Sequence, residues 1–140
     1  MTDDQKRRMC LSDLANLKKS FQLQLDKLGN MNISEKEYDD ALAKISAEYD
    51  SVMWPKYWES FALQFPKRRG WFAETFAPSF GVCELKQLTV KQTNVFKKYC
   101  VADDETWRSG KCYARFGNRL AILEIPKYSK GIGYLTIKEF

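Results

Sequence analysis

Residues 111–125 read KCYARFGNRLAILEI, and this stretch decides the fold of the second part of the chain. Gly117 and Asn118 stand between two runs of residues that favour strands. A two-residue turn that begins with glycine is typical of a β-hairpin. The sequence therefore predicts antiparallel strands over 111–116 and 119–125.

The same turn fixes which residues of the two strands face each other. It places Phe116 opposite Arg119 and Lys111 opposite Glu124. After a loop that contains proline and glycine, a further run at 134–137 predicts a third strand. We therefore expect a three-stranded antiparallel β-meander, which needs helices over one face to be stable.

Two amphipathic helices are expected before this sheet. Apolar residues recur at three- and four-residue intervals over 11–28, and Gly29 with Asn30 should end that helix. Ser34 followed by Glu37 has the capping-box pattern that begins a second helix. A short loop between two helices predicts an antiparallel helical hairpin over 11–53. A dimeric coiled coil is the alternative, but a lysine interrupts its apolar seam.

The middle of the chain is rich in aromatic residues. Trp54-Pro55 should break or restart the helix, because proline disfavours a helical residue before it. A short aromatic helix is expected over 58–65, with Pro66 as its end. Residues 77–87 are expected to be irregular or briefly extended. Together these elements predict an α+β fold in a single domain, residues 1–140.

A basic helix should follow the irregular segment. Thr89 and Gln92 again form a capping box, and the helix should run to about Tyr99. Its inward residues are apolar or aromatic, and its outer face carries lysines. This helix belongs to the basic, aromatic-rich part of the chain, residues 55–140.

The net charge of +5 is divided unevenly along the sequence. Residues 1–54 carry 8 Lys+Arg against 10 Asp+Glu, whereas residues 55–140 carry 15 against 8. An excess of cations among aromatic rings suits contact with a polyanion, because cations bind phosphates and rings stack on bases. A solvated surface around an ordinary core is the alternative.

The candidate residues for binding nucleic acid or another partner are basic side chains of this part and one tryptophan. They are Lys67, Arg68, Arg69, Trp71, Lys91, Lys97, Lys98, Arg108, Lys111, Arg115, Arg119, Lys127 and Lys130. Three consecutive cations before Gly70 predict an exposed loop, since they cannot all be buried without partners. The rings that could stack on bases are Trp71, Phe72, Trp107 and Tyr128, with core packing as the alternative for each.

Several classes of activity are excluded or disfavoured by composition. The chain has no histidine, so it lacks the base of a Ser-His-Asp or Cys-His site and any histidine metal ligand. Its four cysteines, at 10, 83, 100 and 112, include no C-x-x-C pair, so we expect free thiols and no metal. Glu84-Leu85-Lys86 resembles a nuclease strand but lacks a nearby aspartate. The acidic cluster 103–105 is expected to be solvated surface. We expect a protein that is not an enzyme and needs no cofactor.

The location of the protein is inferred from two missing signals. The first ten residues are polar and of mixed charge, which does not fit a signal peptide. No run of about 18 apolar residues could span a membrane. We therefore expect a cytoplasmic protein without a membrane partner.

The segment from Leu88 to Gln92, with Val95, Phe96 and Tyr99, looks like the L-T-x-K-Q helix start of many small phage and bacterial proteins. In size and lack of catalytic groups, the chain also resembles small single-domain proteins of phages and mobile elements. Anti-CRISPR inhibitors are one such group, and they share no motif from which residues could be carried over. Many of them are acidic mimics of nucleic acid, and this basic chain departs from that pattern.

The resemblance implies a phage-type inhibitor of a host nuclease, such as a CRISPR effector. The residues themselves predict a non-enzymatic protein that binds nucleic acid or a nucleoprotein complex. The alternative is a protein-protein interaction module that uses the helical hairpin and the aromatic block, without contacting nucleic acid. Binding to a random oligonucleotide at two salt concentrations separates the two.

Overall fold

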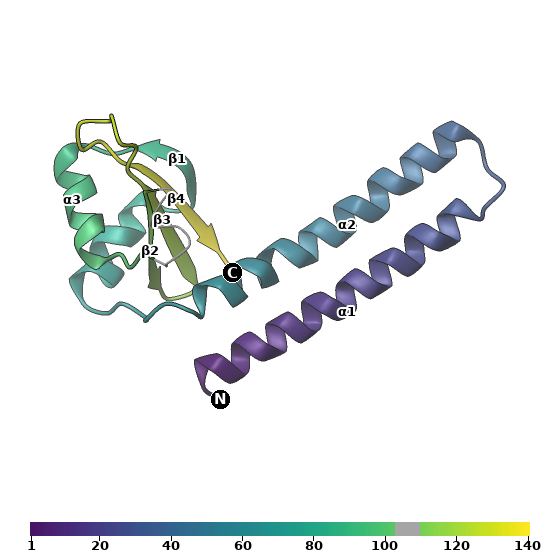
Figure 1. Ribbon diagram of the computed structural model, residues 1–140, viewed down its shortest axis with the longest axis horizontal. Helices are drawn as coiled ribbons and strands as arrows, with labels where there is room; N and C mark the ends of the chain where they lie inside the picture. The colour runs from purple at the N-terminus through teal and green to yellow at the C-terminus, as the bar shows by residue number, and fades with distance from the viewer. Residues whose placement is uncertain (103–109) are drawn as a thin grey trace. The chain divides into compact units, whose positions relative to one another are not determined.

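The structure is a computed structural model that describes residues 1–102 and 110–140 (Figure 1). It divides into two compact units, Met1–Ser60 and Phe61–Phe140. The first contains most of two long helices and is called the helical unit here. The second contains a sheet and is called the sheet unit. Whether the chain unfolds as one domain stays a prediction.

The helical unit begins earlier than the apolar pattern predicts. Helix α1 spans Asp3–Gly29, and its N-cap is Thr2, whose side chain accepts a hydrogen bond from the Gln5 N–H. The Gln5 side chain bonds back to the Thr2 N–H, which completes a capping box. This box lies in a polar segment, so periodicity alone could not reveal it. The predicted end at Gly29 is confirmed, although the C-cap, Asn30, has a right-handed conformation.

Helix α2 spans Glu35–Ala62, and its start confirms the predicted cap at Ser34. The Ser34 hydroxyl accepts a hydrogen bond from the Glu37 N–H at 3.2 Å. The two helices are antiparallel (Figure 1), because Phe21 stacks on Tyr49 while the earlier Asp13 pairs with the later Lys56. The ring centroids are 4.4 Å apart and the ion pair is 3.1 Å long. The predicted helical hairpin is therefore confirmed.

The expected break at Trp54-Pro55 is wrong, because α2 continues through Pro55 to Ala62. A proline inside a helix costs about 3 kcal/mol, since it removes one backbone hydrogen bond and its ring crowds the preceding turn. Tyr49, before the proline, and Lys56, after it, both contact α1, and these contacts stabilise α2 across the proline. The expected short aromatic helix is thus the last part of α2.

The helical unit buries few apolar side chains. Within residues 1–60 the buried hydrophobic residues are Cys10 and Leu28, and the other members of the stripes are half-buried or exposed. Most of the exposed large hydrophobic side chains of the described residues also belong to this unit. They are Met1, Met9, Leu11, Leu23, Met31, Tyr38, Val52, Trp54 and Tyr57.

The sheet unit contains four antiparallel strands in the order β1-β4-β3-β2. Strand β1 spans Cys83–Gln87, β2 Lys111–Phe116, β3 Arg119–Glu124 and β4 Tyr134–Glu139. Strands β2 to β4 form the predicted meander, and the predicted register of β2 with β3 is confirmed.

The prediction of three strands is wrong by one, because β1 pairs with β4. This strand is irregular: its register shifts between Cys83 and Lys86, and Leu85 has a φ of 48°. All its residues after Cys83 are exposed. A strand without alternating burial carries no period-two apolar pattern, so the sequence signal was too weak.

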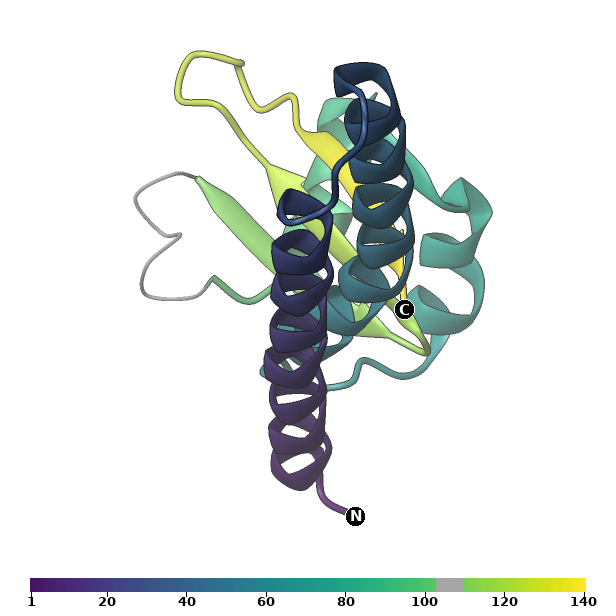
Figure 2. The same ribbon diagram turned by 90° about the vertical axis from the view of Figure 1, so that its right-hand side faces the viewer.

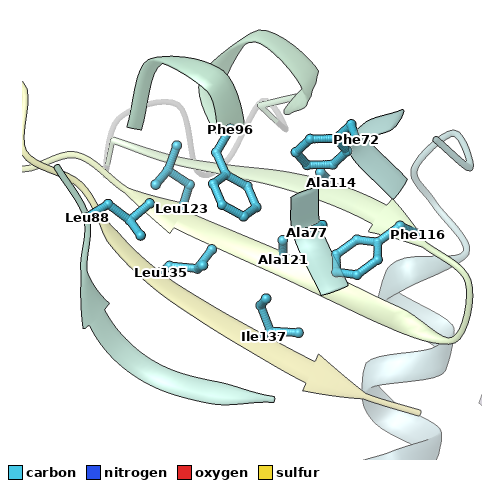
Figure 3. Close-up of a cluster of buried hydrophobic side chains, with 10 residues drawn as sticks. All are labelled: Phe72, Ala77, Leu88, Phe96, Ala114, Phe116, Ala121, Leu123, Leu135 and Ile137. Atoms are coloured by element: carbon cyan, nitrogen blue, oxygen red, sulfur yellow. The ribbon is translucent and has the colours of Figure 1, made fainter. Parts of the chain in front are cut away.

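One face of the sheet forms the core (Figure 3). Phe96 reaches it from helix α3, which spans Val90–Tyr99 as predicted. Phe72 and Ala77 reach it from two short helical turns that the sequence did not predict, a π-helical turn at Phe72–Phe76 and a 3-10 turn at Ala77–Phe80. They pack on small and aliphatic residues of the strands, which are Ala114, Ala121, Leu123, Leu135 and Ile137.

The opposite face is partly covered by aromatic rings that flank the end of α2. Phe65 stacks on Tyr113 of β2 with centroids 5.0 Å apart, and Phe61 meets the same ring edge-on at 4.9 Å. Leu120 on this face is fully buried. The sheet is therefore packed on both faces at this end, which fixes β2 and the segment that follows α2.

Candidate anion-binding surface

Helix α3 presents lysines to solvent. Its N-cap, Thr89, forms the predicted capping box with Gln92. Lys91 and Lys98 are both exposed and lie seven residues apart, which is about two helical turns, so they share one side of the helix. Lys97 is exposed on a different side. Residues 85–102 contain no acidic residue, so nothing on α3 itself offsets this charge.

The loop between β3 and β4 lies against the first turns of α3. The Gly133 N–H donates a hydrogen bond to the Thr93 hydroxyl at 2.9 Å, and Gly131 faces the Val90 side chain. The loop extends beyond the end of the sheet (Figure 2). It carries Lys127 and Lys130, which are both exposed.

A second basic segment reaches the last turn of α3. The Arg68 guanidinium Nε donates to the Tyr99 carbonyl at 2.8 Å, and the Arg68 backbone N–H donates to the Arg115 carbonyl at 2.8 Å. Arg68 is therefore half-buried and structural, and the prediction of a wholly exposed basic loop is wrong at this residue. Its neighbours Lys67 and Arg69 are exposed.

Seven exposed cations thus lie on α3 and on the two segments attached to its ends. We call them the α3 basic surface: Lys67, Arg69, Lys91, Lys97, Lys98, Lys127 and Lys130. None of the seven forms an ion pair with a carboxylate within residues 1–102 and 110–140.

The remaining predicted basic site residues are not part of the α3 basic surface. Arg115 is only 7% exposed. Arg119 pairs with Glu139 at 3.1 Å, and Lys111 is half-buried beside the end of α3. Arg108 lies outside the described residues, as do Trp107 and the acidic cluster 103–105.

Of the three candidate stacking rings that the structure describes, two are exposed. Trp71 is 56% exposed and stacks on Phe76, with centroids 5.2 Å apart. Tyr128 is 88% exposed, and the Lys127 ammonium lies 5.8 Å from its ring centre. Phe72 is in the core, as the core-packing alternative predicted. Trp71 follows Arg69 closely in sequence, so a cation and an open ring occur together at both basic segments.

A hollow of about 370 Å³ lies at the C-terminal end of α3. Lys97 and Lys111 contribute charge to its lining, and Cys100, Cys112 and Ile125 contribute apolar and sulfur atoms. A hydrogen bond from the Cys100 thiol to Cys112 raises the pKa of Cys100 and lowers that of Cys112. Sequence reasoning missed this pair, because the two cysteines follow no motif and meet only through the fold.

No family model, curated protein or solved structure matches the chain. Across residues 1–102 and 110–140, no group of three or more Cys, Asp or Glu side chains is arranged to hold a metal ion. Over the same residues, no helix has the length and apolar character needed to cross a membrane.

Proposed function

We propose that the protein is a binding protein whose α3 basic surface contacts the phosphates of a nucleic acid, free or within a nucleoprotein complex. The observation that supports this proposal is that the seven cations of the surface have no carboxylate partner among the described residues. Unneutralised cations gathered on one helix and its flanking segments attract polyanions and release their counterions.

The dimensions of α3 fit a phosphate backbone. Lys91 and Lys98 are separated by about 10 Å along the helix axis at 1.5 Å per residue. Successive phosphates of one strand rise about 3.4 Å along the axis of a duplex, so two lysines about 10 Å apart can contact two different phosphates of that strand. Trp71 and Tyr128 could stack on unpaired bases near the two ends, which would favour a single-stranded or distorted site.

The test is salt-dependent binding of a fluorescent random oligonucleotide. The variant K67Q/K91Q/K98Q removes three exposed cations of the surface. If each contacts one phosphate, the slope of log affinity against log salt flattens by up to about 2.1 on single-stranded DNA and up to about 2.7 on duplex DNA. The control K18Q/K19Q/K44Q removes the same charge from exposed positions of the helical unit. Equal slopes in both variants would refute contact through α3.

An inhibitor of a nuclease is one specific form of this proposal. Small size, the absence of histidine and a basic surface are consistent with a protein that occupies nucleic acid needed by the enzyme. We expect nuclease inhibition by such a protein to weaken in K67Q/K91Q/K98Q and to persist in the control variant. Inhibition that is equal in both would place the contact elsewhere.

A protein-protein interaction module is the second candidate function, and the helical unit favours it. Within residues 1–60 the buried hydrophobic residues are Cys10 and Leu28, while large apolar side chains of the helical unit such as Leu23 and Val52 are exposed. A partner that supplies a further amphipathic helix would cover such a surface. This function predicts binding that survives K67Q/K91Q/K98Q and is lost on replacing Leu23 and Val52 with polar residues.

A further inference from the structure

Cys100 and Cys112 come together at the C-terminal end of α3. Cys100 is the C-cap of that helix, and Cys112 is the second residue of β2. The residues that follow them, Val101 and Tyr113, exchange both backbone hydrogen bonds, at 2.7 and 2.8 Å. In such an antiparallel pair the preceding residues project to the same side, so the two thiols are diagonal neighbours.

The surroundings of the pair are suited to thiol chemistry. Both cysteines are half-buried, and they pack against the core and also line the hollow. The two thiols interact with each other, and Lys97 adds positive charge near Cys112. Both effects lower the pKa of Cys112 although burial opposes them, and the thiolate is the reactive form.

We propose that Cys112 and Cys100 form a dithiol site that reacts with small anionic disulfides such as oxidised glutathione. Lys97 and Lys111 at the hollow would attract the carboxylates of such a molecule. The Cys112 thiolate attacks one sulfur of the disulfide, whose S–S bond breaks, and one glutathione thiolate leaves and takes a proton from water. This step produces a mixed disulfide on Cys112.

Cys100 completes the reaction. It gives its proton to water and attacks the Cys112 sulfur, and the second glutathione leaves and is protonated in turn. The two protein thiols thereby lose two electrons and form one disulfide, while one external disulfide becomes two thiols.

The second step is aided by the first. The largest cause of the raised Cys100 pKa is its hydrogen bond to Cys112, and the charge of the Cys112 thiolate adds to it. Both causes disappear once Cys112 is part of a mixed disulfide. Burial then still raises the pKa of Cys100, while the nearby Arg68 lowers it.

The other two cysteines serve as internal controls. Cys10 is buried, and burial together with Glu59 raises its pKa. Cys83 is half-buried, and its thiol makes a weak contact of 3.9 Å with the Leu135 carbonyl. Neither is paired with a second thiol, so neither should form an intramolecular disulfide.

The experiment treats the reduced full-length chain with oxidised glutathione and maps its products by mass spectrometry without reductant. We expect a disulfide between Cys100 and Cys112, with Cys10 and Cys83 unmodified. C100S should stop at a stable glutathione adduct on Cys112, and C112S should react several-fold more slowly. K97Q should slow the reaction of Cys112, whereas the matched control K91Q, also on α3, should not.

Two results would overturn the site. One is faster modification of Cys10 or Cys83 than of Cys112, and the other is equal reactivity of C100S and C112S. If circular dichroism shows that a serine variant is unfolded, competitive alkylation of the wild-type chain tests the reactivity of Cys112 instead. Cys112 should then be alkylated several-fold faster than Cys83, and equal rates would refute the proposal. Because the readout is thiol modification, it is independent of nucleic-acid binding.

Discussion

Replacing Thr93 with valine tests how the sheet unit holds the β3–β4 loop against α3. Thr93 is 1% exposed, and its hydroxyl makes two hydrogen bonds. It accepts the Gly133 N–H at 2.9 Å and donates to the Thr89 carbonyl at 2.8 Å. Valine has nearly the same shape but no hydroxyl, so the substitution removes both bonds without opening a large cavity.

The magnitude follows from which group is left without a partner. The Thr89 carbonyl still accepts a hydrogen bond from the backbone N–H of residue 93 at 2.9 Å, so losing the bond from the Thr93 hydroxyl costs little free energy. The Gly133 N–H is buried and loses the partner that the structure gives it. A buried donor without a partner costs about 1–3 kcal/mol, and we expect Thr93→Val to lower the free energy of unfolding by that amount.

Urea unfolding followed by circular dichroism gives the change in stability, provided that the slope with denaturant is unchanged. Hydrogen exchange of the Gly133 amide gives the local effect. Thr93→Ser is the matched control, because it keeps the hydroxyl and loses only a methyl group. Gly133 should lose protection in Thr93→Val and keep it in Thr93→Ser. Unchanged stability and unchanged protection of Gly133 in Thr93→Val would refute the reasoning.

Three further experiments test the core packing, a helix cap and an ion pair. Phe96→Ala should lower the free energy of unfolding by about 3–5 kcal/mol, because a fully buried ring is removed from the core, and urea denaturation measures this. Thr89→Ala should cost about 0.5–2 kcal/mol through the lost cap of α3, and a loss of helical ellipticity without any loss of stability would contradict it. A double-mutant cycle of Asp13→Asn and Lys56→Gln should give a coupling of about 1 kcal/mol or less, because both groups are partly exposed. Asp13 raises the pKa of Lys56, so this contribution is fully present below pH 10.5 and is lost as the pH rises through the raised value, which thermal melts across that range can show.

The elements predicted correctly are those whose signals are local. The turn at Gly117-Asn118 fixed two strands and their register, and the cap at Thr89 fixed the start of α3. Such signals depend on a few neighbouring residues, which the sequence shows directly. The helical hairpin was predicted for the same reason, from its apolar stripes and the cap at Ser34.

The errors arise where distant contacts outweigh local preference. Pro55 has a strong local tendency to end a helix, but contacts between α1 and α2 on both sides of it hold α2 intact. Strand β1 exists because β4 offers it a partner, not because its own residues alternate. Neither effect is visible in the residues next to the position concerned.

The candidate surface was predicted in composition but not in arrangement. Lys91 and Lys98 could be placed on one side of a helix from their spacing alone. The roles of Arg68 and Arg115 could not, since they depend on how the segment after α2 meets the edge of β2. The pairing of Cys100 with Cys112 has the same origin in long-range strand contacts.

The two edges of the sheet also bear on how the protein behaves at high concentration. Backbone bridges from Lys67 and Val101 occupy part of the outer edge of β2. The other edge, β1, is short, shifted in register and bent at Leu85, and it carries the charged pair of Glu84 with Lys138 of β4. Irregular, charged or covered edges do not template the addition of strands from other molecules. The sheet unit should therefore resist β-mediated aggregation even when many copies accumulate in one place.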